Sequence, residues 1–203
     1  DYNTDMYDTG LTNIPTSSEV RTEYFPHAPG NYGSPASSSS RKLYRKVYRD
    51  QHFTNAKLPY NYNALFVNCT FDETLFIDAS KTTSSYYNNV RFDNCTFNGP
   101  IVTDTPSSLK WQYNCLYFTG SATFNNDTLT EATILAPHFN VNLGNTTPIA
   151  GNENVLTGAI VGGIVDVRGN ANVYGTIISM CDTTSWTSGY VTNIGVSLTD
   201  GGS

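Results

Sequence analysis

The sequence carries little charge. Only 14% of its 203 residues are Asp, Glu, Lys or Arg, whereas about a quarter is usual in a globular domain. Asn, Thr, Ser, Gly and Tyr fill the gap, which is typical of β-solenoids and of secreted surface proteins. Acidic residues outnumber basic ones by 17 to 11, and the resulting net charge of −6 argues against nucleic acid as a partner.

Several other features are missing. The chain has no apolar run of about 18 residues, so we predict no membrane span. No Cys-x-x-Cys or Cys/His spacing suggests zinc, and no Gly-x-Ser-x-Gly sequence marks a serine hydrolase. His27, His52 and His138 have no nucleophile motif beside them. We therefore predict no catalytic residue, no metal site and no cofactor.

What the sequence does contain is a repeat. The segment 67–71, VNCTF, returns 26 residues later as DNCTF at 93–97, and a weaker third copy ends at Phe124. A unit of this length cannot bury its apolar face alone, so the repeat predicts units stacked on one another. Apolar and polar residues alternate within each copy, which is the period of a strand. These patterns predict an all-β fold, a single-stranded parallel β-helix.

The repeat also predicts which side chains stack. Cysteine and phenylalanine face inward, and the cysteines are either free thiols or a Cys69–Cys95 disulfide. Each Asn sits where the chain turns, because Asn tolerates a left-handed backbone, and its amide forms a buried ladder. This ladder is preferred over N-glycosylation for the Asn-x-Thr triplets at Asn68 and Asn94. The predicted structural ladder consists of Asn68, Asn94, Cys69, Cys95, Phe71, Phe97 and Phe124.

The outward-facing rows hold few charges. The repeat stacks Leu65, Arg91 and Tyr117 in one row, and Val67, Asp93 and Thr119 in the next. A polysaccharide lyase or glycoside hydrolase needs clustered carboxylates, and one arginine with one aspartate is more simply a surface pair. The apolar members of these rows need a cover.

Two resemblances follow from these residues. The repeat over about 46–126 resembles the rungs of right-handed parallel β-helix proteins, a broad group that includes pectate lyases and many surface proteins. Farther on, Gly163, Gly169 and Gly175 are spaced by six within a Val- and Ile-rich stretch. That stretch resembles the short rungs of bactofilin-like, polymer-forming β-helices and of pilus-associated proteins. It is also what closing rungs of the same β-helix would look like.

The N-terminal quarter differs from the rest. Residues 1–40 have no periodicity and predict an extended arm with a Ser/Gly/Pro-rich linker, followed by a β-helix domain at 41–203. Residues 41–52 read equally well as a short capping helix and as a first rung. The arm lies either on its own chain or on a neighbour, with the neighbour preferred. Because the chain begins at Asp1 rather than Met, we expect a processed chain or a fragment.

Two functions compete. The first is a non-catalytic structural module in an extracellular or cell-surface assembly, filament or adhesive structure, with partners that are further copies or another structural subunit. Its predicted assembly surface is Leu65, Val67, Tyr117, Tyr2, Tyr7, Tyr24 and Phe25. The alternative is a polysaccharide-binding module, or a lyase or hydrolase, in which aromatic rings stack on sugars. Its candidates are Trp111, Tyr113, Trp186 and Tyr190.

Overall fold

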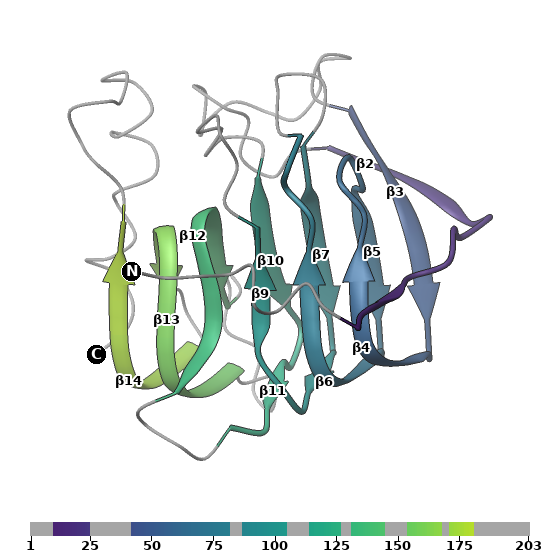
Figure 1. Cartoon of the computed structure of the whole chain (residues 1–203). Helices are drawn as coiled ribbons and strands as arrows, with labels where there is room; N and C mark the ends of the chain where they lie inside the picture. The colour runs from purple at the N-terminus through teal and green to yellow at the C-terminus, as the bar shows by residue number, and fades with distance from the viewer. Residues whose placement is uncertain are drawn as a thin grey trace, which may run out of the picture.

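A computed structural model shows an all-β chain (Figure 1). The structure describes residues 10–24, 42–81, 87–104, 114–126, 131–144, 154–167 and 171–180. These ranges contain strands and turns but no helix. The strands are β1 (Thr12–Asn13), β2 (Val20–Tyr24), β3 (Lys42–Arg49), β4 (His52–Leu58), β5 (Ala64–Val67), β6 (Thr70–Ile77), β7 (Asn89–Asp93), β8 (Thr96–Phe97), β9 (Ile101–Thr103), β10 (Cys115–Thr119), β11 (Thr123–Phe124), β12 (Ala132–Leu143), β13 (Asn154–Val167) and β14 (Ala171–Ser179).

All fourteen strands join one sheet that is almost entirely parallel. Its order is β1-β4-β6-β8-β11-β13-β12-β10-β7-β5-β3-β2, with β14 on β13 and β9 between β6 and β12. Among these strands only β2 and β3 pair antiparallel. From β1 to β13 this order follows one row of strands, and from β12 to β2 it follows a second row. Figure 1 shows the strands standing side by side. Side chains from both rows of strands meet in the main core.

The predicted register is confirmed. Leu65 pairs with Arg91, and Arg91 pairs with Tyr117, so the three residues form one row. Phe71 pairs with Phe97, and Phe97 pairs with Phe124. The repeat of 26 to 27 residues therefore sets which strands are neighbours, because each copy supplies the same alternation to the next.

The core is a double column of aromatic rings. Phe97 stacks between Phe71 and Phe124, with ring centroids 5.2 and 5.1 Å away. The second column includes Phe92 and Phe118, which meet Phe97 edge to face at 5.1 and 5.7 Å. Offset stacks and edge contacts are the arrangements that aromatic rings prefer, so each ring is held on several sides.

The turns are left-handed where the sequence predicts it, but the amide ladder differs from the prediction. Asn68 and Asn94 both have φ of 53°. Both are exposed, so their predicted burial is wrong: the turn points its amides to solvent. Asn68 donates to Asp50 Oδ1 at 3.3 Å, whereas Asn94 Oδ1 accepts from the backbone N–H of Ser121 at 2.8 Å. The predicted hydrogen bond between the side-chain amides of Asn68 and Asn94 is not formed.

A different polar ladder runs beside the phenylalanines. Asn98 Nδ2 donates to Asp72 Oδ1 at 2.5 Å, and Asn125 Nδ2 donates to Asn98 Oδ1 at 2.6 Å. Each of these residues directly follows a stacked phenylalanine. The ladder therefore links three successive repeats on the outer surface.

The described part of the 41–52 stretch forms strands rather than a capping helix, as the alternative prediction required. β3 and β4 occupy this stretch, with Tyr48 paired to Phe66 and Phe53 paired to Phe71. The helical spacing of the apolar residues is overridden because β3 finds strand partners on both sides, β2 and β5.

The described part of the N-terminal arm, residues 10–24, lies on its own chain and is called the cap below, so the preferred prediction of a place on a neighbour is wrong for these residues. β1 pairs with β4, and β2 pairs with β3. Ile14 is buried in the core, and Tyr48 donates its hydroxyl to the Pro15 carbonyl at 2.7 Å. Leu11 packs on a second, outer cluster formed by Phe76 and its stacked neighbours. The cap thus covers the strand edges at this end of the stack.

The thiols of Cys69, Cys95 and Cys115 are free and buried. Burial raises the pKa of Cys115 to about 12, so almost none of it is thiolate at pH 8. We expect iodoacetamide to leave Cys115 unmodified at pH 8 in the folded protein and to modify it fully in urea. Peptide mapping by mass spectrometry measures both, and rapid native labelling of Cys115 would contradict its placement.

Candidate functional site

One pocket lies between the cap and the outer side of the sheet. It has a volume of about 340 Å³, at the lower end of the range for small-molecule sites. β2 supplies one wall, and β3, β7 and β10 supply the others. Its lining residues are Arg21, Thr22, Glu23, Arg45, Arg91, Tyr117 and Thr119.

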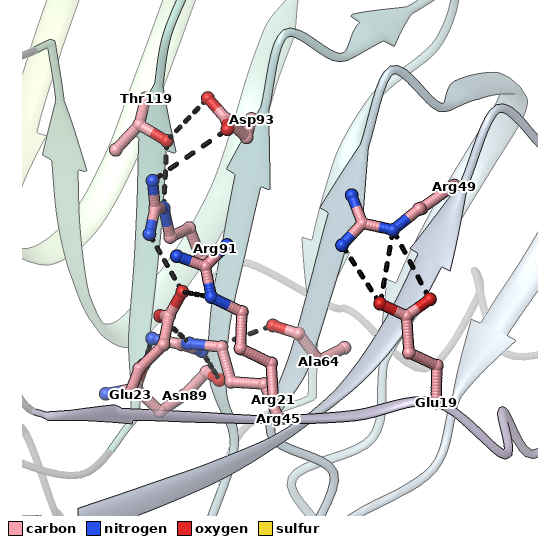
Figure 2. A network of polar contacts seen from close by, with 10 residues as sticks. All are labelled: Glu19, Arg21, Glu23, Arg45, Arg49, Ala64, Asn89, Arg91, Asp93 and Thr119. Atoms are coloured by element: carbon pink, nitrogen blue, oxygen red, sulfur yellow. Dashed lines mark hydrogen bonds and ion pairs between the residues drawn. The ribbon is translucent and has the colours of Figure 1, made fainter.

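Three guanidiniums converge on the Glu23 carboxylate (Figure 2). Arg45 Nε lies 2.5 Å from Oε2, and Arg91 Nη1 lies 2.9 Å from Oε1. Arg21 Nε is farther away, at 3.5 Å from Oε1. Charge-assisted bonds of this kind are roughly twice as strong as neutral ones. Glu23 therefore links β2 both to its direct partner β3 and, through Arg91, to β7.

Arg45 is the buried member of the network, with a side chain only 1% exposed. It also donates to the carbonyls of Ala64 and Asn89, at 3.2 and 2.7 Å, and to Asn89 Oδ1 at 2.8 Å. Burial lowers the pKa of Arg45, and Glu23 opposes that change. A guanidinium stays charged even so, which makes Arg45 dependent on its carboxylate partner.

Arg91 joins the pocket to the next outer row. Its Nε donates to Thr119 Oγ1 at 3.0 Å, and its Nη2 lies 3.8 Å from Asp93 Oδ2. The predicted surface pair of Arg91 with Asp93 is thus present, but Glu23 is the nearer carboxylate. No sequence pattern predicts this contact, because Glu23 and Arg91 are 68 residues apart and Glu23 lies in the non-repetitive arm.

The pocket has an excess of positive charge. Its three arginines face Glu23 and the adjacent Asp93, which leaves one cation in excess on a chain whose net charge is −6. Within the described ranges, no group of three His, Cys, Asp or Glu could hold a metal ion. The arrangement suits the binding of an anion, since arginine presents several N–H donors in a planar fork.

The predicted assembly surface is placed differently. Leu65 and Tyr117 are buried within the chain, and Val67 is half-buried. The prediction that Leu65 and Tyr117 form an accessible surface is therefore wrong, although they do face outward as predicted. Tyr24 ends β2, and its side chain is not described. The remaining predicted residues lie outside the described ranges: Tyr2, Tyr7, Phe25, Trp111, Tyr113, Trp186 and Tyr190.

A second notable region lies at the other end of the stack, in β14. One inward row of the core runs through Ala56, Leu75, Ile101, Ile134 and Ile160 and ends at Ile177. Ile160 is fully buried, whereas Ile177 is 41% exposed. Tyr174 and Met180 are also exposed nearby along the chain. Among the described residues, the core is thus covered by the cap at one end, whereas its row ends at β14 on an exposed isoleucine.

Comparison with protein-family models, with curated proteins and with solved structures finds no match to this chain. In the part of the chain that is described, no helix is long and apolar enough to cross a membrane. The function therefore rests on the geometry of the two regions described above.

Proposed function

We propose that the chain is a structural parallel β-helix module of an extracellular or cell-surface assembly, and that it joins its partner through the open end at β14. The observation that carries this proposal is the row that ends at Ile177. Every inward member before it is buried, so the exposed isoleucine occupies a position built for a further strand. A second copy or another β-rich structural subunit would supply that strand.

Three rows of parallel pairing support the β-helix interpretation. Strands of successive repeats pair in three rows, which are β3-β5-β7-β10, β4-β6-β8-β11 and β6-β9-β12. Strands that pair in three such rows are what a chain wound about one axis would give, although the step varies from 18 residues (Tyr48 to Phe66) to 26 residues (Phe66 to Phe92). Strand edges at the end of such a stack pair with other chains unless they are covered.

The two ends differ in what they offer to a further strand. β1 and β2 cover the edges of β4 and β3, whereas in the described ranges β14 pairs only with β13. The scarcity of charge and the resemblance of the last repeats to polymer-forming β-helices also favour assembly. A non-catalytic role agrees with a pocket whose carboxylate, Glu23, is paired with arginines rather than placed as an acid or base.

The assembly proposal predicts the effect of a charge at the open end. The parent chain should form species larger than 22.2 kDa as its concentration rises, and Ile177→Lys should reduce them strongly, because a lysine on a strand edge opposes pairing. Size-exclusion chromatography with light scattering measures both. Tyr44→Lys, an exposed position on β3 at the capped end, serves as the control and should assemble like the parent. A monomeric parent at all concentrations would refute the proposal.

A further inference from the structure

The row that ends at Ile177 has a continuation in the sequence beyond β14. Ile160 pairs with Ile177, a step of 17 residues, and a further step of 17 falls on Ile194. From there Ile194, Val196 and Leu198 alternate with small or polar residues, which is the period of a strand. Residues 181–203 lie outside the described ranges, and their sequence repeats the pattern of the strand before them.

We propose that residues 193–196 form a further parallel strand on β14 of the same chain, in which Ile194 covers Ile177. This strand occupies the edge at which the proposed partner joins, so the two compete and the chain limits its own assembly. The regulatory role rests on the proposed function, whereas the placement of the strand does not.

The edge of β14 suits such a neighbour. Its nine residues, 171–179, include no charge and no proline, the features that usually keep an edge strand unpaired. Ile177 is 41% exposed at the end of a buried row. Residues 193–196 are uncharged as well, so their isoleucine would take this side chain out of water without burying a charge.

The connection to the new strand has a precedent in the structure. Asn154 pairs with Ala171, so 17 residues complete one circuit from β13 to β14. The same number leads from Thr176 to Asn193. A segment tethered by a short connection has an effective concentration in the millimolar range. The tether therefore favours the chain's own segment over that of a second copy.

The start of the strand follows from a glycine row. Gly158 and Gly175 pair, with φ of 110° and 151°. A Cβ added to Gly175 would lie 1.9 Å from the carbonyl oxygen of Gly158, so the backbones of this row leave no room for a side chain. Thr192 falls next in the row and cannot continue it. The proposed pairing therefore begins at Asn193, beside Thr176.

Disulfide capture tests the placement independently of assembly. Directly opposite residues of neighbouring strands lie about 4.8 Å apart, within the Cα window of a disulfide. Thr176→Cys with Asn193→Cys, in a Cys181→Ser background, should therefore form an intrachain bond under mild oxidation. Non-reducing electrophoresis and peptide mapping measure it. A disulfide between two chains, or none at all, would overturn the proposal.

Thr176→Cys with Ser197→Cys is the register control. Ser197 lies on the same face of the proposed strand as Asn193 but four residues farther along, about 13 Å at 3.3 Å a residue. That separation exceeds the reach of a disulfide, so the control pair should stay reduced. Equal cross-linking of both pairs would indicate a segment without a fixed register and would overturn the placement.

A lysine in the covering strand tests the regulation. Ile194→Lys should release the cover and lower the apparent dissociation constant of assembly about tenfold, because the edge is then open in a larger fraction of molecules. Size-exclusion chromatography with light scattering measures it. Ser197→Lys adds the same charge on the opposite face and should assemble like the parent. Unchanged assembly of Ile194→Lys, or a loss like that expected for Ile177→Lys, would overturn the regulation.

The two proposals fail separately. A parent chain that is monomeric at all concentrations but forms the intrachain disulfide would refute the proposed function and support the placement of residues 193–196. A chain that assembles without forming that disulfide would support the proposed function and overturn the placement.

Discussion

Replacing Phe97 by alanine should lower the free energy of unfolding by about 3–5 kcal/mol. Phe97 is stacked between Phe71 and Phe124 and also meets the rings of Phe92 and Phe118. Neighbouring repeats are tied by backbone pairing at Thr70, Thr96 and Thr123, so they cannot collapse into the hole left by the ring. Urea unfolding followed by circular dichroism measures the loss.

Tyr44→Ala is the matched control for Phe97→Ala. Tyr44 is also an aromatic residue on a strand, but it is 62% exposed and lies outside the core. Its removal should shift the unfolding midpoint little, because an exposed ring buries little surface. If both variants unfolded at the same denaturant concentration as the parent, the aromatic double column would not be the centre of the fold.

The second large effect is expected at Glu23. Glu23→Gln removes the only carboxylate that contacts the buried Arg45 in the described structure, and Arg45 keeps its charge. Leaving one partner of a buried pair uncompensated costs about 3–5 kcal/mol. The cap should detach before the rest of the chain unfolds, because β2 loses its contacts to Arg45 and Arg91 together. Limited proteolysis within residues 10–24, followed over urea concentration, measures this release.

Glu19→Gln controls for the loss of a cap carboxylate as such. Glu19 pairs with Arg49 at 2.9 Å, and both side chains are about half exposed. Exposed pairs contribute little, so the cap of this variant should be as resistant to protease as that of the parent. A Glu23→Gln protein with an equally resistant cap would show that the arginine network does not hold β2.

The stacked core was predictable from sequence, and the reason is local repetition. The 26-residue step places the same alternation on neighbouring strands, so one alignment fixes both the inward phenylalanines and the outward row of Leu65, Arg91 and Tyr117. The ladder of Asp72, Asn98 and Asn125 was missed although a signal exists, an acid or amide directly after each stacked phenylalanine. The ladder was predicted at the turn residues Asn68 and Asn94 instead, but their amides point to solvent.

The pocket could not be predicted in the same way. Glu23 belongs to an arm without periodicity, and its contact to Arg91 spans 68 residues. Nothing in the spacing of the repeat marks which strand the arm crosses. The helical alternative for 41–52 was wrong for a related reason, since the sequence of a short segment says nothing about strand partners on both sides. Non-local contacts of unique segments carry no repeated signal.

The distance between Thr54 and Tyr174 tests the stacked register most directly. The two residues lie at the ends of the row that contains Asp72, Asn98 and Asn125, five strand steps apart. At about 4.8 Å a step, backbone positions in a parallel β-helix should be roughly 24 Å apart. Spin labels on Thr54→Cys and Tyr174→Cys, in a Cys181→Ser background, allow pulsed electron paramagnetic resonance to measure this spacing. A single narrow distribution near that value is expected, and a broad or much longer distribution would contradict the stacked parallel β-helix.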